Sequence, residues 1–214
     1  MNAVDKKLRD LLTELMNIEF LDEFYLAGGT NLALRENHRI SVDLDLFVYR
    51  DFSIEQSNFL NIKLKNTFGS RYQNIQVSEV GVFGSIDNIK VDFVNFPYPL
   101  LEPIDSINDF RMSSKIDIAA TKINAIVGRG SKKDFYDIDK LLEFFSMKEM
   151  LLAYKTKFKV DTLAFAKKSL VYFMDANNTL LVNNHVVSLE KKSWEQIQAN
   201  ITKAIKTSKN DFQL

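Results

Sequence analysis

Hydrophobic and polar positions repeat with two different periods in the first part of the chain. Apolar side chains recur every three or four residues between Leu8 and Met16, and this spacing predicts an amphipathic helix over residues 3–17. Residues 24–27 form a short apolar run that two glycines end, which is typical of a buried strand. Between residues 42 and 48, apolar side chains occupy every second position, which predicts a strand with one buried face.

Further elements are expected before the first proline. They are a short helix that Thr30 caps and that runs to about Arg35, a helix over residues 52–68 that Ser53 caps, and strands over residues 75–86 and 89–96. Two glycines interrupt the first of these strands. Asp87 and Asn88 separate the two strands and favour a hairpin turn.

The second half of the chain has helical periodicity almost throughout. The expected helices cover residues 113–127, 132–145, 147–155, 160–174 and 194–206. A loop or turn is expected from Asn177 to Asn184, and the only three prolines, between residues 97 and 103, indicate a domain boundary. We therefore expect an α/β (α+β) fold, with a mixed β-sheet in an N-terminal domain over residues 1–104 and an α-helical domain over residues 105–214.

Composition limits the class of protein. With 214 residues, 46% of them hydrophobic, the chain is long enough for one large or two small domains with a sizeable core. It has no cysteine, which excludes disulfides and cysteine zinc sites and fits a reducing compartment. No apolar run approaches the roughly 20 residues that cross a bilayer. The charged N-terminus lacks the apolar core of a signal peptide, so we expect a cytoplasmic protein without a membrane partner.

Charge is unevenly distributed along a chain that is neutral overall. Residues 1–110 carry 10 Lys and Arg against 17 Asp and Glu, a net charge of −7. Residues 111–214 carry 18 against 11, a net charge of +7. An acidic half suits metal cations and a basic half suits a polyanion, although lysine-rich solvated helices would give the same counts.

Asp43 and Asp45 are the first candidates for chemistry. Residues two apart on a strand point to the same face, so both carboxylates are expected to project together. Neighbouring buried carboxylates repel each other unless a cation lies between them. Mg²⁺ prefers oxygen ligands and keeps coordination positions open for phosphate, so the pair predicts a metal site. The alternative is a strand end with two solvated acids.

Lys90 and Asp92 share one face of another expected strand, which makes Asp92 a candidate third carboxylate. Three carboxylates can hold two metal ions, an arrangement that activates a hydroxyl group and stabilises a leaving phosphate. A Lys-Asp pair on an exposed sheet face would give the same pattern, and the residues alone leave both interpretations open.

Gly28-Gly29-Thr30 lies between an expected strand and an expected helix, just ahead of the carboxylate strand. Glycine allows the backbone to approach a phosphate closely, and the N-terminus of the helix offers free N–H groups. A Gly-Gly turn is more often only a turn. What favours a phosphate site here is the position of the motif, between a strand and a helix and just before the carboxylate strand. It is not a Walker P-loop, because no Gly-Lys-Ser/Thr ends it.

The helical half has its own charged positions. Lys115, Lys122 and Arg129 recur every seven residues, which predicts a stripe from which a lysine could reach a triphosphate, or snorkel at the rim of the core. On the next helix, Asp134 falls within the inward apolar stripe and Asp137 at its margin. An inward carboxylate needs a partner. We expect Asp134 to form a functional or inter-domain ion pair with Lys122 or Arg129 rather than only to cap its helix.

The two histidines give no metal signal. His38 is expected in an exposed turn beside Arg39, and His185 is isolated, so a histidine zinc site is not expected. The chain also lacks the Gly-x-Ser-x-Gly elbow of serine hydrolases.

Taken in order, the motifs resemble those of a known family. They are Gly28-Gly29-Thr30, Arg39-x-Ser41-x-Asp43-x-Asp45-Leu46, Lys90-x-Asp92, Lys122 and Lys133-Asp134-Phe135-Tyr136-Asp137. This set resembles the AbiEii/AbiGii toxin family, a branch of the nucleotidyltransferases related to DNA polymerase beta. The resemblance covers roughly residues 20–145, and no motif beyond about residue 150 matches. It implies a nucleotidyltransferase fold with an appended helical domain.

The resemblance also implies roles for individual residues. The nucleoside triphosphate would be bound by Gly28, Gly29, Thr30, Arg39, Ser41, Lys122 and Asp137. The catalytic set would be Asp43, Asp45, Asp92, Lys122 and Asp134. Within it, Asp43, Asp45 and Asp92 would bind Mg²⁺ or Mn²⁺, and Asp92 would have a general-base role.

The leading interpretation is a metal-dependent enzyme that transfers a nucleoside monophosphate from a nucleoside triphosphate to a macromolecular acceptor, RNA or tRNA. Members of the family often act as toxins paired with an antitoxin in abortive infection, so an antitoxin partner is also expected. Two alternatives keep part of this picture. One is a nucleotidyltransferase for a small, antibiotic-type acceptor, and the other is a nucleotide-binding module without catalysis.

Overall fold

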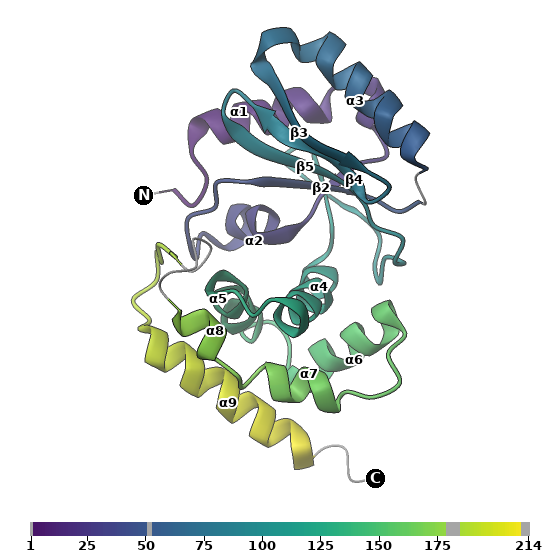
Figure 1. Cartoon of the computed structure of the whole chain (residues 1–214). Helices are drawn as coiled ribbons and strands as arrows, with labels where there is room; N and C mark the ends of the chain where they lie inside the picture. Colours follow the sequence, from purple (N-terminus) through teal and green to yellow (C-terminus); the bar gives the residue numbers. More distant parts are fainter. Residues whose placement is uncertain (1, 51–52, 179–184, 211–214) are drawn as a thin grey trace. The chain divides into compact units, whose positions relative to one another are not determined.

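In the computed structural model, which describes residues 2–50, 53–178 and 185–210, the chain divides into two compact units (Figure 1). The sheet unit comprises Val4–Asn31 and Ser41–Ser113. The helical unit comprises Met1–Ala3, Leu32–Ile40 and Ser114–Leu214. The sequence-based boundary after residue 104 differs from this division, because two short strands that follow the prolines continue the sheet.

The sheet unit is built on a seven-stranded sheet with the order β3-β4-β5-β2-β1-β7-β6. The strands are β1 (Tyr25–Leu26), β2 (Leu44–Val48), β3 (Tyr72–Ser78), β4 (Gly81–Ile86), β5 (Ile89–Asn95), β6 (Asp105–Ile107) and β7 (Phe110–Met112). Strand β2 runs parallel to β5, and β1 runs parallel to β7, whereas the other neighbours are antiparallel. The sheet is therefore mixed, as the sequence predicted.

The two faces of β2 differ in burial, as its alternation predicted. Leu44, Leu46 and Val48 are buried, whereas Asp45 and Phe47 on the other face are only partly buried. Two helices, α1 (Lys6–Met16) and α3 (Ile54–Phe68), lie together on one side of the sheet in Figure 1. Their buried leucines cover the apolar face of the sheet, which leaves the carboxylate face of β2 for chemistry.

Caps define where these helices begin. The Asp5 side chain accepts a hydrogen bond from the Leu8 N–H at the start of α1, and Ser53 forms a capping box with Gln56 at the start of α3. The predicted Ser53 cap is thus confirmed, while Phe52 lies outside the described residues. Two short 3-10 helices, η1 (Glu19–Leu21) and η2 (Gly69–Arg71), follow α1 and α3.

The strand predicted over residues 75–86 is two strands, β3 and β4, which pair as a hairpin. A Cβ at Gly81 would overlap with the backbone oxygen of Phe93, so this glycine allows a close approach of β4 to β5. The hairpin turn at Asp87-Asn88 is confirmed. Both residues have left-handed φ values, 52° and 65°, and Ile86 pairs with Ile89 across the turn.

The helical unit contains most of the remaining helices. They are α4 (Lys115–Gly128), α5 (Lys132–Leu141), α6 (Met147–Phe158), α7 (Ala164–Ser169), α8 (Met174–Asn177) and α9 (Trp194–Asn210). The single helix predicted over residues 160–174 is wrong, because α7 ends before Leu170 and the chain then turns. This turn lets Phe173 pack against the rings of Phe135 and Trp194, at 5.1 and 5.9 Å between ring centroids.

Helix α2 (Gly28–Glu36) begins in the sheet unit and ends in the helical unit. The segment after it, residues 38–40, pairs with residues 187–189: Ile40 N donates to Val187 O, and Leu189 N donates to His38 O, both at 2.9 Å. The loop predicted for Asn177 to Asn184 lies mostly outside the described residues. Among the described residues, no helix combines the length and the apolar composition needed to span a bilayer.

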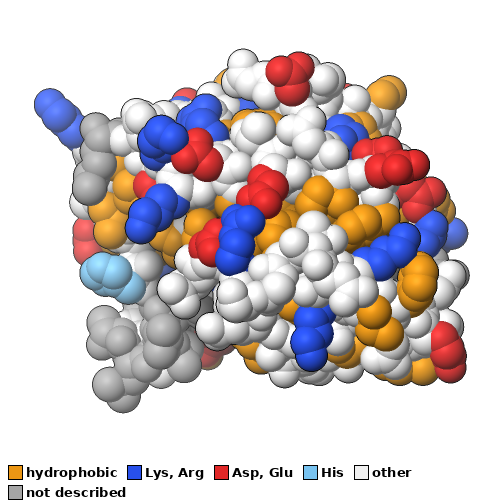
Figure 2. Space-filling view, turned by 90° about the horizontal axis from the view of Figure 1, so that it is seen from above, with side chains coloured by type: hydrophobic (Ala, Val, Ile, Leu, Met, Phe, Trp, Pro, Cys, Tyr) orange, Lys and Arg blue, Asp and Glu red, His pale blue; other side chains and the backbone are white. Residues whose placement is uncertain are grey.

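The face of the molecule drawn in Figure 2 carries acidic and basic side chains intermixed, with hydrophobic side chains gathered between them. Exposed apolar residues on α3 include Phe59 and Ile62, which are 59% and 54% exposed. The unequal charge counts of the two halves therefore do not give this face a field of one sign.

Candidate functional site

Gly28 and Asp45 meet where β1 ends and α2 begins. Ala27 N donates a 2.8 Å hydrogen bond to Asp45 O, which holds the end of β1 beside β2. Gly28 has a φ of +65°, and a Cβ at this position would overlap with Asp45 Oδ2. Both the backbone conformation and the space therefore require glycine here. The Asp45 carboxylate lies directly against the diglycine turn.

Thr30 fixes the first turn of α2 to the segment before β2. Its hydroxyl donates to Asp43 O and lies 2.8 Å from Ser41 Oγ. Since Thr30 has a single proton to donate, Ser41 is the donor between the two hydroxyls. The predicted cap role of Thr30 is wrong, because α2 already begins at Gly28 and Thr30 lies inside its first turn. What the two hydroxyls do instead is hold Asp43 beside the turn.

Asn31 also supports this turn, although the sequence did not mark it as a site residue. Its buried amide donates to Leu26 O at 2.9 Å and to Ser113 O at 3.0 Å. These bonds tie the start of α2 to the ends of β1 and β7. A single asparagine in a helix carries no sequence signal for this role, because its partners come from separate strands.

The carboxylates of Asp45 and Asp92 belong to directly paired residues of the parallel strands β2 and β5. Paired residues in neighbouring strands project to the same face, with their Cα atoms about 5 Å apart. Asp92 is buried, and its Oδ2 accepts a hydrogen bond from Lys90 Nζ. Its Oδ1 has no hydrogen-bond partner among the described residues. A buried, unsatisfied carboxylate oxygen is costly and is typical of a site that another group completes.

Lys90 is the cation beside these acids. Burial lowers its pKa, but the hydrogen bond to Asp92 and the charges of Asp92, Asp45 and Asp43 raise it by more. The pKa of Lys90 is therefore above its ordinary value, and the ammonium group partly neutralises all three carboxylates. The Lys-Asp pair that the sequence left open is present, and the same Asp92 also neighbours Asp45.

The donor chemistry of this face fits Mg²⁺ bound largely by its substrate. No group of three or more His, Cys, Asp or Glu side chains in the described residues is placed to hold a metal ion. Mg²⁺ commonly takes one or two protein carboxylates together with substrate phosphates, and Asp43 and Asp45 supply such oxygens beside the turn. The three-carboxylate metal centre stays a prediction.

The other predicted site residues form a buried ionic network in the helical unit. Asp137 is fully buried and accepts two hydrogen bonds from Arg39, at 2.6 Å from Nε and 2.8 Å from Nη2. Lys122 Nζ lies 2.6 Å from Asp137 and 2.8 Å from Asp134. Arg129 also reaches Asp134, at 3.2 Å. Each acid therefore shares Lys122 and has an arginine of its own.

Electrostatics hold this network in its charged form. Burial raises the pKa of Asp137, but the charges of Arg39 and Lys122 lower it by more, so that this pKa lies well below its ordinary value. The pKa of Asp134 is lowered in the same way, against burial, by Lys122 and Arg129. Burial lowers the pKa of Lys122, but the two aspartates raise it above its ordinary value.

The ion pairs predicted for Asp134 with Lys122 or Arg129 are present, but all three residues lie within the helical unit, so the pairs are not inter-domain. A functional role of Asp134 stays a prediction. Ser131 precedes α5 but makes no side-chain capping bond, which removes the capping alternative. Lys122 is only 4% exposed, so it does not snorkel at the rim.

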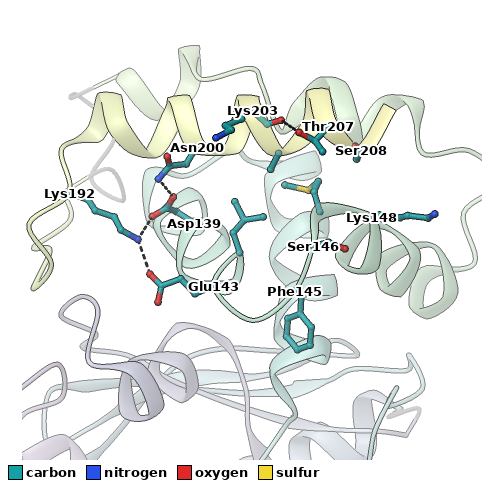
Figure 3. A pocket seen from close by; sticks show the side chains of 13 residues that line it. Asp139, Glu143, Phe145, Ser146, Lys148, Lys192, Asn200, Lys203, Thr207 and Ser208 are labelled. Carbon is teal, nitrogen blue, oxygen red and sulfur yellow. Dashed lines mark hydrogen bonds and ion pairs between the residues drawn. The ribbon is translucent and has the colours of Figure 1, made fainter. Parts of the chain in front are cut away.

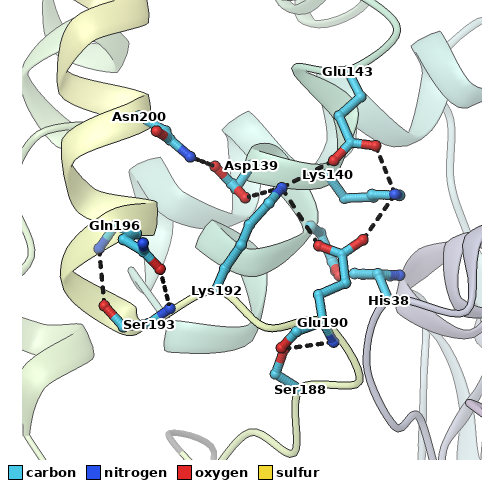
Figure 4. Close-up of polar contacts among 11 residues, drawn as sticks. His38, Asp139, Lys140, Glu143, Ser188, Glu190, Lys192, Ser193, Gln196 and Asn200 are labelled. Atoms are coloured by element: carbon cyan, nitrogen blue, oxygen red, sulfur yellow. Dashed lines mark hydrogen bonds and ion pairs between the residues drawn. The ribbon is translucent and has the colours of Figure 1, made fainter.

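The exposed position predicted for His38 is wrong, because its side chain is only 2% exposed. Its Nε2 donates to Asp137 Oδ1 at 2.8 Å, while residues 187–189 cover its backbone. Figure 4 shows that a second ionic cluster anchors the covering segment: Lys140 Nζ binds Glu190 at 2.8 Å, and Lys192 Nζ binds Asp139 at 3.0 Å. His38 is thus held by residues about 150 positions away in the sequence.

A pocket of about 430 Å³ lies between α5, α6 and α9 (Figure 3). Its acidic side chains, Asp139 and Glu143, both bind Lys192, and Asn200 also bonds to Asp139. None of the predicted site residues lines it. The lining also includes Lys148 and Lys203, so the pocket has charged groups of both signs.

The structure therefore sorts the predicted residues into two groups. The sheet unit gathers Gly28, Gly29, Thr30, Ser41, Asp43, Asp45 and Asp92, and the helical unit gathers Arg39, Lys122, Asp134 and Asp137. The first group combines a glycine turn with carboxylates. The second is an ion-paired cluster in which two arginines and a lysine surround two aspartates.

The sequence matches a protein-family model and a protein of Aquifex aeolicus. Residues 10–212 match the model of a family described as "Nucleotidyl transferase AbiEii toxin, Type IV TA system". The chain is 31% identical over 210 residues to the uncharacterized protein aq_aa25 of Aquifex aeolicus (strain VF5), covering 96% of this chain and 98% of that protein.

Two solved structures have the same fold. MenT4, the nucleotidyltransferase toxin Rv2826c of Mycobacterium tuberculosis H37Rv, aligns over 94% of this chain and 82% of its own, with a TM-score of 0.65 and 13% identity. JHP933 of Helicobacter pylori aligns over 98% of this chain and 95% of its own, with a TM-score of 0.57 and 15% identity. The mixed α/β fold is therefore a nucleotidyltransferase fold.

Proposed function

Because the chain belongs to the AbiEii nucleotidyl transferase toxin family, we propose that it transfers a nucleoside monophosphate from a nucleoside triphosphate to an RNA acceptor. The observation that carries this proposal is the contact of Asp45 with Gly28, at the point where β1 passes into α2. A phosphate at this turn would meet the N–H groups of the helix start on one side and the carboxylate strand on the other.

The reaction would form one bond and break one. A hydroxyl oxygen of the acceptor would attack the α-phosphorus, and the bond from that phosphorus to the oxygen that bridges to the β-phosphate would break. Pyrophosphate would leave with the bonding electron pair. The hydroxyl proton would pass to a carboxylate, for which Asp92 Oδ1 is the best candidate because it is buried and has no other hydrogen-bond partner.

Other residues of the sheet unit would orient the triphosphate and hold the metal ion. The turn at Gly28 and the hydroxyls of Thr30 and Ser41 would orient the triphosphate, and Asp43 and Asp45 would hold Mg²⁺ or Mn²⁺ against it. The bound metal would neutralise charge on the phosphates. Positioning and electrostatic stabilisation carry most of the rate in such transfers.

The acceptor and the partner follow from charge and family. The basic second half of the chain, with its net charge of +7, supports a polyanionic acceptor such as RNA. It argues against a cationic antibiotic, which would need an acidic pocket. The family description names a toxin–antitoxin system, which supports an antitoxin as the partner of this chain.

The direct test incubates the protein with each of the four α-labelled nucleoside triphosphates, with Mg²⁺ or Mn²⁺, and with total RNA. We expect one nucleotide to label RNA. The variant Asp45→Asn keeps the volume of the side chain and removes the charge, and it is expected to lower the labelling rate by roughly 10²–10³-fold. The matched variant Asp87→Asn, on an exposed turn, should label RNA like the wild type.

Two outcomes would contradict the proposal. If no nucleotide labels RNA with either metal, the transfer reaction fails. If nucleotides bind with the metal and nothing is transferred to RNA, protein or aminoglycosides, the chain is a nucleotide-binding module. The Lys90–Asp92 pair is the observation that favours such a module, since it already neutralises the proposed base.

A further inference from the structure

Three aromatic rings continue the carboxylate face of the sheet unit. Phe47 follows Asp45 by two residues on β2, and Phe96 follows Asp92 by four residues on β5 and its extension. Phe96 N donates to Val48 O at 2.9 Å, so the pairing of the two strands continues past the end of β5. Alternation therefore places Phe47 and Phe96 on the same face as the acids.

The rings form a cluster that is partly exposed to solvent. Phe47 and Phe96 stack, with 4.6 Å between ring centroids and 29° between planes, and Tyr98 lies 5.0 Å from Phe96. Tyr25, on β1, packs its edge against Phe47 from the buried side. Phe47 and Phe96 are partly buried, and Tyr98 is 37% exposed.

We propose that Phe47, Phe96 and Tyr98 form the subsite for the base of the nucleoside triphosphate, with Tyr98 as the ring that the base contacts. This inference rests on the proposed function, because the Gly28 turn must hold the triphosphate. Phe47 lies two residues after Asp45 on β2, and residues two apart on a strand are separated by about 7 Å. The ribose of a nucleotide can span this separation. A nucleotide with its phosphates at Asp45 can therefore reach the rings with its base.

The chemistry of the cluster suits a nucleobase. Every base has a flat π-face that stacks on Phe or Tyr, and the cluster presents rings rather than a fixed set of hydrogen-bond groups. Stacking alone tolerates any base. The subsite should therefore raise the affinity for all four nucleotides and leave the choice among them to other contacts.

The test compares ligands with and without a base. Calorimetry with Mg²⁺ would measure the affinity of the wild type and of Tyr98→Leu for the four nucleoside triphosphates and for inorganic tripolyphosphate. Removal of the ring should weaken nucleotide binding roughly tenfold and leave tripolyphosphate binding unchanged. Tyr98→Phe keeps the ring and should recover most of the affinity that Tyr98→Leu loses. Phe59→Leu removes a more exposed ring from α3, which covers the apolar face of the sheet, and should bind like the wild type.

The outcomes separate this inference from the function on which it rests. If Tyr98→Leu binds nucleotides like the wild type, or loses affinity for nucleotide and tripolyphosphate alike, the subsite is overturned while the triphosphate site stands. The same holds if the wild type binds nucleotides no more tightly than tripolyphosphate. If the wild type binds neither ligand, both the subsite and the proposed function are wrong.

Discussion

Asp45 and Asp92 are directly paired residues of two parallel strands, so two negative charges face the same side of the sheet at neighbouring positions. Lys90, which binds Asp92, is a cation beside this pair. A bound triphosphate would add several negative charges beside the same acids.

Removal of divalent metal is therefore expected to separate activity from stability. With EDTA, nucleotide transfer to RNA should stop, because the acids and the phosphates would repel each other without the charge of the metal. The melting temperature of the ligand-free protein should change little, because Lys90 already compensates Asp92. Labelling and thermal unfolding, with and without Mg²⁺, measure the two effects. Transfer that persists in EDTA would contradict the metal requirement.

Gly28→Ala is expected to damage the candidate site directly. The backbone at φ +65° would cost roughly 1–2 kcal/mol with a Cβ, and that Cβ would displace the Asp45 carboxylate. Nucleotide affinity should therefore fall along with stability. Gly69→Ala is the matched control, because Gly69 has a φ of +55° and no atom within 4 Å of a Cβ. It should lose stability and keep nucleotide affinity.

Denaturation and calorimetry on both glycine variants distinguish the two effects. If Gly69→Ala loses as much nucleotide affinity as Gly28→Ala, general strain explains the loss, and the contact between Gly28 and Asp45 has no role in binding.

Local patterns predicted the parts of the molecule that depend on neighbouring residues. The alternation over residues 42–48 predicted the buried face of β2, and helical spacing predicted that Asp134 points inward to a partner. In both cases the signal lies within a few residues. The partner of Asp134, Lys122, is also only 12 residues away.

Contacts between distant segments could not be predicted in the same way. Arg39 and Asp137 are 98 residues apart, and nothing near either residue specifies the other. His38 was expected to be exposed because its neighbours are polar, yet a segment far along the chain covers it. The rings of Phe47 and Phe96 meet only because β2 and β5 are adjacent, which the order of strands in the sequence does not reveal.

Asp137→Asn is expected to destabilise the helical unit strongly. The change removes the carboxylate that pairs with both Arg39 and Lys122. Removing one partner of a buried ion pair costs about 3–5 kcal/mol, because the other charge stays buried without its counter-charge. Urea denaturation measures the loss. Asp87→Asn, which breaks an exposed pair with Arg71, should have little effect. Equal losses in the two variants would show that burial of the Asp137 network does not matter for stability.

Acid is expected to unfold the chain through the same aspartates. In the folded state the pKa values of Asp134 and Asp137 lie below their ordinary value of about 3.9, so the unfolded chain binds protons more readily. Their stabilising contribution is therefore fully present above about pH 4 and is lost as the pH falls through that value toward the folded pKa. The free energy of unfolding, measured in urea between pH 7 and pH 3, should drop steeply for the wild type. Asp137→Asn starts lower and has one depressed carboxyl fewer, so its curve should fall less steeply, and parallel curves would show that Asp137 is not ionised in the folded protein.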